Sequence, residues 1–253
     1  MRLDGQLRIG AIGDLHCPRV GSGELRSLFT QVAERSDVLL LCGDITDYGK
    51  PEEAKLFVAA LPALNGIPVI AVLGNHDYES GDADALTGIF EDHGIRVLDG
   101  TSVEIQGVGF VGVKGFAGGF GDRILQAWGE SVFKRFVRES VDEALKLESA
   151  LAKLTTSVRV VLMHYAPVFD TVMGESPEII PFLGTSRLEE PINRYGVTAV
   201  FHGHAHHGTL EGRTREGIPV YNVALPLLRL AAPAQAPVRV IHVPIPRQVG
   251  QPI

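Results

Sequence analysis

The sequence predicts an α/β protein in which two β-sheets pack together and helices lie outside them. Its apolar runs are short, rich in Val, Ile and Leu, and bounded by Gly or Pro, which is typical of strands buried on both faces of a sheet. Strand and helix patterns alternate over the first ninety or so residues, which predicts right-handed crossovers and a parallel sheet. A hairpin pattern then interrupts this order, and a second strand–helix–strand series follows it.

Three strands and three helices are expected in the first part of the chain. One helix covers Gly23–Arg35 and carries a single apolar stripe, and a second covers Pro51–Ala60 with proline in its first turn. A weaker helical pattern covers Asp82–His93. The strands that alternate with these helices are Ile9–Ile12, Val38–Cys42 and Val69–Leu73.

The later elements begin with an antiparallel hairpin at Gly100–Lys114, followed by a loop rich in Gly and Phe at Gly115–Gly121. The longest helical pattern covers Ser131–Leu154. The remaining expected elements are the strands Val158–Met163 and Thr198–Phe201, the helix Ser186–Tyr195, and short strands near Thr209–Glu211, Val220–Val223 and Val238–Val243.

We expect residues 1–253 to form a single domain, with 244–253 as a loose C-terminal tail. The composition, 45% hydrophobic and 21% charged, is that of a soluble globular enzyme. A formal net charge of −7 argues against a nucleic-acid polymer or an anionic membrane as partner, although bound metal ions could still create a local positive site.

A cytoplasmic location is the default expectation. The first residues lack the apolar core of a signal peptide, and no stretch approaches the ~20 apolar residues of a membrane helix. The two cysteines, Cys17 and Cys42, do not suggest a disulfide framework, so a reducing compartment fits. No pattern in the sequence predicts an oligomeric state.

Each strand-like apolar run of the two series ends in residue types that bind metals. Ligands of open α/β sheets gather at the carboxyl ends of the strands, so segments almost two hundred residues apart are expected to meet at one edge. The motifs are, in order, Asp14-Leu15-His16, Gly43-Asp44, Gly74-Asn75-His76-Asp77, His164, and Gly203-His204-Ala205-His206. Each motif alone is common by chance, as a turn, a helix cap or a solvated loop, but all five in this order are improbable by chance.

This series of motifs resembles that of the calcineurin-like metallophosphoesterase superfamily over most of the chain. The resemblance implies a four-layer α/β/β/α sandwich, with two mixed sheets face to face and helices outside. It also implies two divalent, or mixed-valence, metal ions that share Asp44. One ion would be held by Asp14, His16, Asp44 and His206, and the other by Asp44, Asn75, His164 and His204.

The residue types of these ligands make chemical sense without the resemblance. Mixed carboxylate, imidazole and amide donors suit Mn, Fe, Co, Ni or Zn, and suit Ca poorly. Two such ions would clamp the attacking and leaving oxygens of an in-line displacement. We therefore expect a phosphoesterase in which a metal-bridging hydroxide attacks phosphorus and His76 acts as general acid. The resemblance to the family's serine/threonine phosphatases implies that Asp47, three residues after Asp44, would hold the protonated imidazole, and Asp77, the neighbour of His76, is the alternative.

Two departures from the pattern of the family's protein phosphatases favour a phosphodiesterase of the small bacterial type, a branch that includes the cyclic-nucleotide enzymes. Tyr48 stands where those phosphatases carry an Arg that grips phosphate, and a monoester loses more from that change because it carries more charge. Asp77 stands where they usually carry Glu. A small or nucleotide-like diester is the expected substrate. The alternatives are a phosphomonoesterase, a nucleotide pyrophosphatase and, least favoured because every ligand position is intact, a non-catalytic scaffold.

Substrate choice is expected to depend on the segment Gly115–Glu130. Its aromatic residues could stack on a base and Arg123 could bind phosphate, with Tyr48 as a further substrate contact. The simpler interpretation, which we favour, is a loop that caps the long helix and places its aromatic side chains, Trp128 among them, in the core.

Overall fold

Two mixed β-sheets form the centre of the molecule in the computed structural model, which describes residues 5–246. The first sheet has five strands in the order β11–β1–β2–β3–β4. Strands β1 to β4 are parallel to one another, and β11 pairs antiparallel with β1 at the sheet edge. The bounds are β1 Gln6–Ile12, β2 Val38–Cys42, β3 Val69–Val72, β4 Ile95–Val97 and β11 Arg239–Pro244.

The second sheet has six strands in the order β5–β6–β7–β8–β10–β9. Its four central strands are parallel, and both edge strands are antiparallel to their neighbours. The expected hairpin is confirmed, because β5 and β6 pair antiparallel from Thr101 opposite Gly112 to Ile105 opposite Val108. The bounds are β5 Thr101–Ile105, β6 Val108–Gly112, β7 Val158–Leu162, β8 Ala199–His202, β9 Glu211–Arg213 and β10 Pro219–Asn222.

The alternation of side chains along the second sheet explains how four layers form. On β7, Val160 and Leu162 point into the main core with the residues of β1 to β3, whereas Val161 belongs to a second apolar cluster on the opposite face. That second cluster includes Leu147 and Leu151 of the long helix α4. Successive residues of a strand point to opposite faces, so a strand buried on both sides is apolar throughout.

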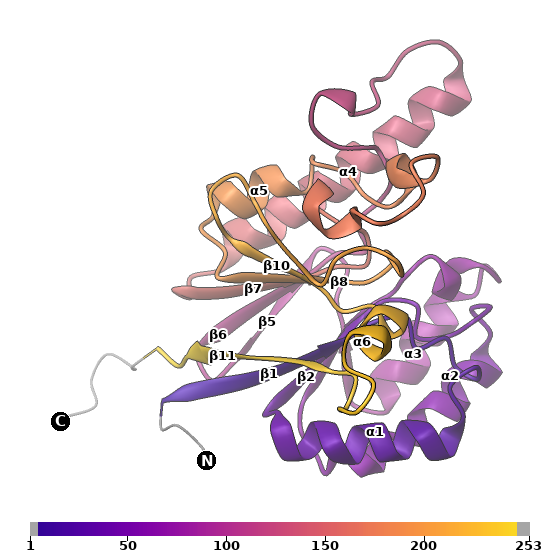
Figure 1. Ribbon diagram of the computed structural model, residues 1–253, viewed down its shortest axis with the longest axis vertical. Coiled ribbons are helices and arrows are strands. Elements are labelled where there is room, and N and C mark those ends of the chain that lie inside the picture. The colour runs from indigo at the N-terminus through magenta and orange to yellow at the C-terminus, as the bar shows by residue number, and fades with distance from the viewer. Residues whose placement is uncertain (1–4, 247–253) are drawn as a thin grey trace.

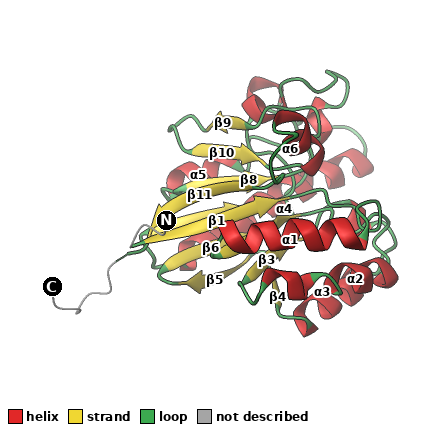
Figure 2. Cartoon of the chain, turned by 60° about the horizontal axis from the view of Figure 1, so that its bottom comes forward, coloured by secondary structure: helices red, strands yellow, loops and turns green. Residues whose placement is uncertain are grey.

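Helices cover the outer face of each sheet. Figure 1 shows α1 below the first sheet, α2 and α3 to its right, and α4 and α5 above the second sheet, and Figure 2 shows α1, α2 and α3 gathered on one side of the strands. The predicted four-layer α/β/β/α arrangement is therefore confirmed. The helices are α1 Ser22–Arg35, α2 Pro51–Val58, α3 Ala83–Asp92, α4 Ser131–Lys153, α5 Glu189–Arg194 and α6 Leu225–Ala231. No helix in the described residues has the length and apolar character needed to cross a membrane.

Three features differ from the sequence-based expectation. Helix α6 is not predicted because Pro226 suggests a break, whereas here proline lies in the first turn of the helix, where it is tolerated. Strand β4 is not predicted because it has only three residues and one buried side chain. The expected tail does not begin at 244: Pro244 ends β11, and Ile245 donates a main-chain hydrogen bond to Gly5. Residues 247–253 of that tail lie outside the described residues, and the single-domain expectation stays a prediction.

Candidate metal centre

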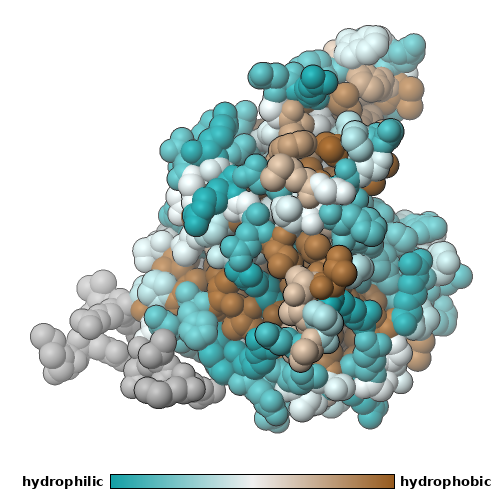
Figure 3. All heavy atoms as spheres, in the orientation of Figure 1, coloured by the Kyte–Doolittle hydropathy of each residue, from teal (hydrophilic) through white to brown (hydrophobic). Residues whose placement is uncertain are grey.

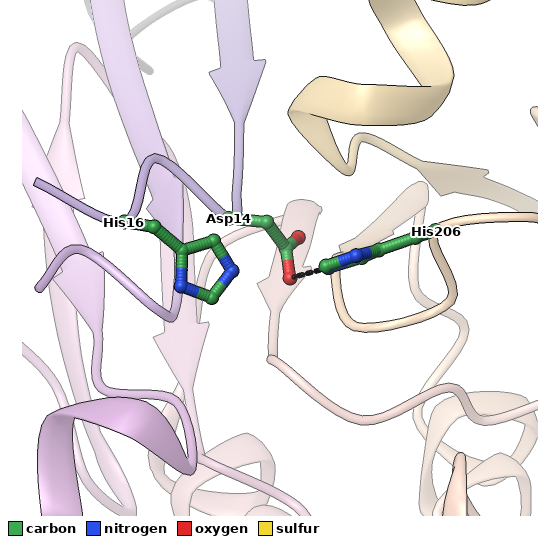
Figure 4. A group of neighbouring side chains, drawn as sticks. All are labelled: Asp14, His16 and His206. Carbon is green, nitrogen blue, oxygen red and sulfur yellow. Dashed lines mark hydrogen bonds and ion pairs between the residues drawn. The ribbon is translucent and has the colours of Figure 1, made fainter. Parts of the chain in front are cut away.

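The predicted ligands lie in loops that follow β1, β2, β3, β7 and β8 at their carboxyl ends. Asp14 and His16 come from the β1 loop and His206 from the loop after β8, and Figure 4 shows these three side chains facing one another. Their ligand atoms lie within 4.8 Å of one another, and His206 Nε2 is 2.9 Å from Asp14 Oδ1. The structure therefore brings together residues that are up to 192 positions apart in the chain.

A second group forms beside the first from Asp44, His164 and His204, whose ligand atoms also lie within 4.8 Å of one another. Asn75 adds an amide oxygen, because its Oδ1 is 2.9 Å from His164 Nε2. The Asp44 carboxylate lies between the two groups. Its Oδ1 is 3.4 Å from His164 Nε2 and its Oδ2 is 3.8 Å from His16 Nε2. One carboxylate could thus serve both groups.

Backbone strain concentrates at these residues. Six non-glycine residues in 5–246 have a positive φ, and four of the six are predicted ligands: Asp14 at 57°, His16 at 45°, Asp44 at 49° and His204 at 69°. A left-handed backbone costs free energy for such residues and persists where the surroundings enforce it, which happens most often at functional sites. This backbone strain is a second line of evidence for a functional site, independent of the motif pattern.

The glycines of the motifs are required by close approach to the ligand side chains. A Cβ on Gly74 would lie 2.2 Å from Asp44 Oδ1, and one on Gly203 would lie 2.4 Å from Asp14 Oδ2. Gly43 has a φ of +81°, and a Cβ there would lie 2.4 Å from His164 Nδ1. The glycines in the Gly-Asp, Gly-Asn-His-Asp and Gly-His-x-His motifs therefore leave room for the neighbouring ligand.

Polar atoms without partners show that the donor set fits a cation. Both ring nitrogens of His16 are buried and have no hydrogen-bond partner in residues 5–246. An imidazole buried in this way loses free energy unless one nitrogen binds a ligand. His164 is arranged for the same purpose, because its Nδ1 lies 3.0 Å from the Cys42 carbonyl, so that Nδ1–H can donate there and leave Nε2 facing the Asp44 and Asn75 oxygens.

Neighbouring charges in the centre shift the pKa values of its acids and histidines. Burial opposes ionisation of Asp44, but the nearby His164 outweighs burial and holds the pKa of Asp44 well below its usual range. Burial likewise opposes protonation of His164, but Asp44 outweighs it and raises the pKa of His164 to about 9. Burial lowers the pKa of His204 to about 3. Protonation of His164 and metal binding by its ring therefore compete.

We expect metal binding to be lost on acidification. A histidine ligand must be neutral, and the pKa of His164 is raised to about 9 and that of His206 is also raised, so protons compete with the ion and increasingly so as the pH falls. Metal content measured after gel filtration should be highest above about pH 9, should fall as the pH is lowered, and should be small well below about pH 6. Circular dichroism at each pH separates loss of metal from unfolding. Full loading at about pH 4.5 would show that these histidines are not ligands.

His76 lies next to the first group and contacts no predicted ligand through a ring nitrogen. Its Nδ1 is 2.7 Å from the main-chain carbonyl of Asp47, and the rings of His76 and His16 meet edge to face at 4.6 Å. The expected partner of the imidazole was the Asp47 carboxylate. That carboxylate is instead 3.9 Å from His76 Nδ1 and is bound at 2.7–2.8 Å by the guanidinium of Arg19. Asp47 therefore holds His76 mainly through its backbone.

Asp77, the rival of Asp47, has a different role. Its carboxylate accepts hydrogen bonds from the main-chain N–H groups of Ile45, Thr46 and Gly74 and from the Thr46 hydroxyl. It is fully buried and ties the β2 loop to the β3 loop. These contacts fix Asp44 relative to Asn75, and no hydrogen bond or ion pair among the described residues joins the Asp77 carboxylate to the His76 ring.

The two expected substrate contacts are not joined to the metal groups by any hydrogen bond or ion pair in residues 5–246. Tyr48 is 47% exposed, and Lys50 lies over its ring at 5.3 Å. Arg123 is exposed on the 3-10 turn Gly121–Arg123 and its side chain has no hydrogen bond or ion pair among the described residues. Their substrate roles stay predictions. Trp128 is 66% exposed, so the expectation that the aromatic side chains of this segment lie in the core is wrong for it, although Phe120 is buried.

Two residues at the site were not singled out from the sequence. Arg19 lies three residues after His16, and its position inside the first motif loop was the available signal. Tyr165 follows His164, and its ring lies 4.4 Å from the ring of His204 and 5.4 Å from that of His164. Neither residue belongs to a motif that would indicate a functional role, because an arginine in a loop and a tyrosine beside a strand are both common.

Comparison with known proteins identifies the family of the chain. The family model described as calcineurin-like phosphoesterase matches residues 7–208. A protein of Rhodococcus erythropolis, named probable cyclic nucleotide phosphodiesterase, is 27% identical over 217 residues. The match covers 83% of this chain and 65% of the length of that protein.

Solved structures share the fold. Phosphopantetheinyl hydrolase from Mycobacterium tuberculosis superposes with a TM-score of 0.67 at 15% identity, covering 94% of this chain and 97% of that one. A purple acid phosphatase from yellow lupin superposes with a TM-score of 0.52 at 16% identity, covering 79% of this chain and 38% of that one. At these identities the likeness establishes the fold alone.

Proposed function

Because the chain belongs to the calcineurin-like phosphoesterase family, we propose that it is a metal-dependent phosphoester hydrolase that prefers phosphodiesters. The observation that carries the proposal is the position of the Asp44 carboxylate between two groups of metal-type donors, 3.4 Å from His164 and 3.8 Å from His16. A shared carboxylate is what a pair of ions requires. The relative named probable cyclic nucleotide phosphodiesterase supports a small or nucleotide-like diester as substrate.

Seven side chains would hold the two ions. Asp14, His16, Asp44 and His206 would hold one, and Asp44, Asn75, His164 and His204 would hold the other. The mixture of carboxylate, imidazole and amide donors suits Mn, Fe, Co, Ni or Zn. When bound, such ions lower the pKa of water and neutralise charge on phosphoryl oxygens.

His76 would supply the proton that the leaving oxygen needs. Its Nδ1–H donates to the Asp47 carbonyl, which fixes the tautomer and the ring orientation and leaves Nε2 for the substrate. The side chain is 30% exposed, so a substrate can reach it. Asp47 orients the ring through its main chain, while Arg19 holds the Asp47 carboxylate in place.

The preference for diesters rests on the absence of a free guanidinium at positions 19 and 48. Tyr48 offers no guanidinium, and the guanidinium of Arg19 is occupied by Asp47. A dianionic monoester gains more from a bidentate arginine than a monoanionic diester does. A hydrogen bond to a charged group contributes about 1.5–3 kcal/mol. Without an arginine to make this bond, the affinity for a monoester should be about tenfold to a hundredfold lower.

Paired assays on the metal-reconstituted protein test this proposal. We expect kcat/KM for bis(p-nitrophenyl) phosphate to exceed that for p-nitrophenyl phosphate by about tenfold or more. Activity should be abolished by a chelator and restored by metal. His93→Ala, which changes an exposed histidine at the end of α3, is the control and should retain activity.

Two results would contradict the proposal. Faster hydrolysis of the monoester would assign the site to a phosphomonoesterase. Full metal loading with no hydrolysis of any phosphoester, cyclic nucleotides and nucleoside pyrophosphates included, would indicate a binding scaffold.

A further inference from the structure

An apolar groove of about 450 Å³ lies beside the N-terminal part of α4. This volume is within the ~300–1,000 Å³ of small-molecule sites. Figure 1 shows this end of α4 projecting past the second sheet, and Figure 3 shows hydrophobic side chains gathered there. The groove is lined by Leu125, Val132, Phe133, Phe136, Pro181 and Phe182.

Large apolar side chains are unusually exposed around this groove. Val132 is 64% exposed and Phe182 is 55% exposed, although both line it. Trp128 is 66% exposed and its ring lies 5.5 Å from that of Phe133, at the edge of the groove. Several such side chains together on a surface mark a binding site, whereas single ones do not.

Two contacts join the groove to the metal centre. The main-chain carbonyl of Phe182 is 3.3 Å from Nε2 of His204, while the Phe182 side chain lines the groove. A series of rings makes the second contact. Phe136 lies 5.0 Å from Phe116, Phe116 lies 5.9 Å from Tyr165, and Tyr165 lies 4.4 Å from His204. The packed rings fill the space between Phe136 and the metal centre, so the groove comes nearest to the centre at Phe182, which contacts His204 and lines the groove. A substituent of a phosphorus bound at the metal centre would reach the groove past Phe182.

We propose that this groove binds an aliphatic arm of the phosphodiester substrate. The proposal rests on the proposed phosphodiesterase function and names the chemistry of one substituent on phosphorus. The groove is lined by six apolar residues and no charged or hydrogen-bonding side chain. None of the six lining side chains can hydrogen-bond the polar edge of a nucleobase, whereas an alkyl or acyl chain needs no such partner. The lining therefore favours an aliphatic occupant over a nucleobase.

A chain-length series on the metal-loaded enzyme measures the effect. The substrates are p-nitrophenyl diesters with a methyl, butyl or octyl arm, used below their micelle concentrations. Each buried methylene adds up to about fourfold in affinity, so kcat/KM should rise by at least about tenfold from methyl to octyl. Phe133→Ser should lower the octyl-to-methyl ratio by about tenfold, because it removes a ring from the groove wall. The ratio cancels any loss of folded protein, which affects both substrates equally.

The matched control is Leu145→Ser, which makes the same kind of change at a 51% exposed position of α4 that does not line the groove. It should keep the wild-type ratio. A flat series in the wild type, or equal ratios in all three proteins, would overturn the proposal. So would a p-nitrophenyl nucleoside diester that exceeds the octyl diester, because that result assigns a base to the groove.

A binding measurement separates failure of the groove from failure of the proposed activity. Trp128 is the only tryptophan of the chain and reports on the groove by fluorescence. Octyl phosphate should shift its emission at concentrations at least about tenfold lower than methyl phosphate, and Phe133→Ser should remove this difference. Retained binding of octyl phosphate with no diester hydrolysis would refute the proposed activity, while the groove would still be shown to bind an aliphatic chain. Diester hydrolysis with no chain-length effect would refute binding of the arm in the groove and leave the proposed activity intact. The same conclusion would follow if the protein self-associates, Phe133→Ser abolishes that association, and the octyl-to-methyl ratio stays unchanged.

Discussion

Replacing Asp44 by Asn is expected to empty both metal sites at once. The Asp44 carboxylate has one oxygen 3.4 Å from His164 and the other 3.8 Å from His16, so a single side chain faces both donor groups. Asparagine is nearly the same size but carries no charge, and one of its two atoms is a donor that repels a cation. Loss of a supporting partner typically costs 10–100-fold in metal affinity, and loss of a shared ligand should exceed about a hundredfold for both ions.

Metal content per chain after gel filtration measures this result, with wild type near two ions. Comparison variants distinguish a ligand shared by both ions from a ligand of one ion only. His206→Ala should weaken one ion, because His206 touches only the first group, and Asn75→Ala should weaken the other. Asp44→Asn should remove both. If the Asn variant retains two ions, Asp44 does not bridge, and the two groups are independent sites.

The convergence of the ligands could be predicted from sequence because the topology leaves few alternatives. Buried strands such as Val38–Cys42 are apolar throughout, which identifies them in the sequence and indicates a sheet covered on both faces. Parallel strands end at a common edge, so polar residues that follow several of them must lie near one another. Asp14 and Asp44 follow adjacent strands in this way, and the structure places them at one centre.

Orientation within the centre was not predictable in the same way. The positions of Asp47 and His76 were clear from the motifs, but the bonding of His76 to the Asp47 carbonyl depends on the backbone of the β2 loop. Arg19 captures the Asp47 carboxylate from a loop without any pattern that would reveal it. The apolar groove was missed because its walls come from residues 125–136 and 181–182, and only packing brings these segments together.

His76→Ala is expected to retain both metal ions and to lose most of its turnover. The His76 ring is held by a 2.7 Å contact between Nδ1 and the Asp47 carbonyl, and the two predicted ligand sets are complete without it. Its loss should therefore leave metal content unchanged. A positioned general acid contributes about 10²–10⁴-fold, so kcat should fall by that factor for a diester with a poor leaving group.

The leaving group and the metal content together decide whether His76 acts in this way. An acidic leaving group such as p-nitrophenol needs little protonation, so His76→Ala should slow p-nitrophenyl diesters far less than alkyl diesters. Equal losses for both would argue against a general acid.

The donor atoms of His76 also lie within 4.8 Å of those of His16 and Asp47, an arrangement that could itself hold a cation. The Arg19 guanidinium already neutralises Asp47, at 2.7 Å, and a second cation there would be repelled. Loss of an ion from His76→Ala would show that this third group, and not catalysis, is the role of His76.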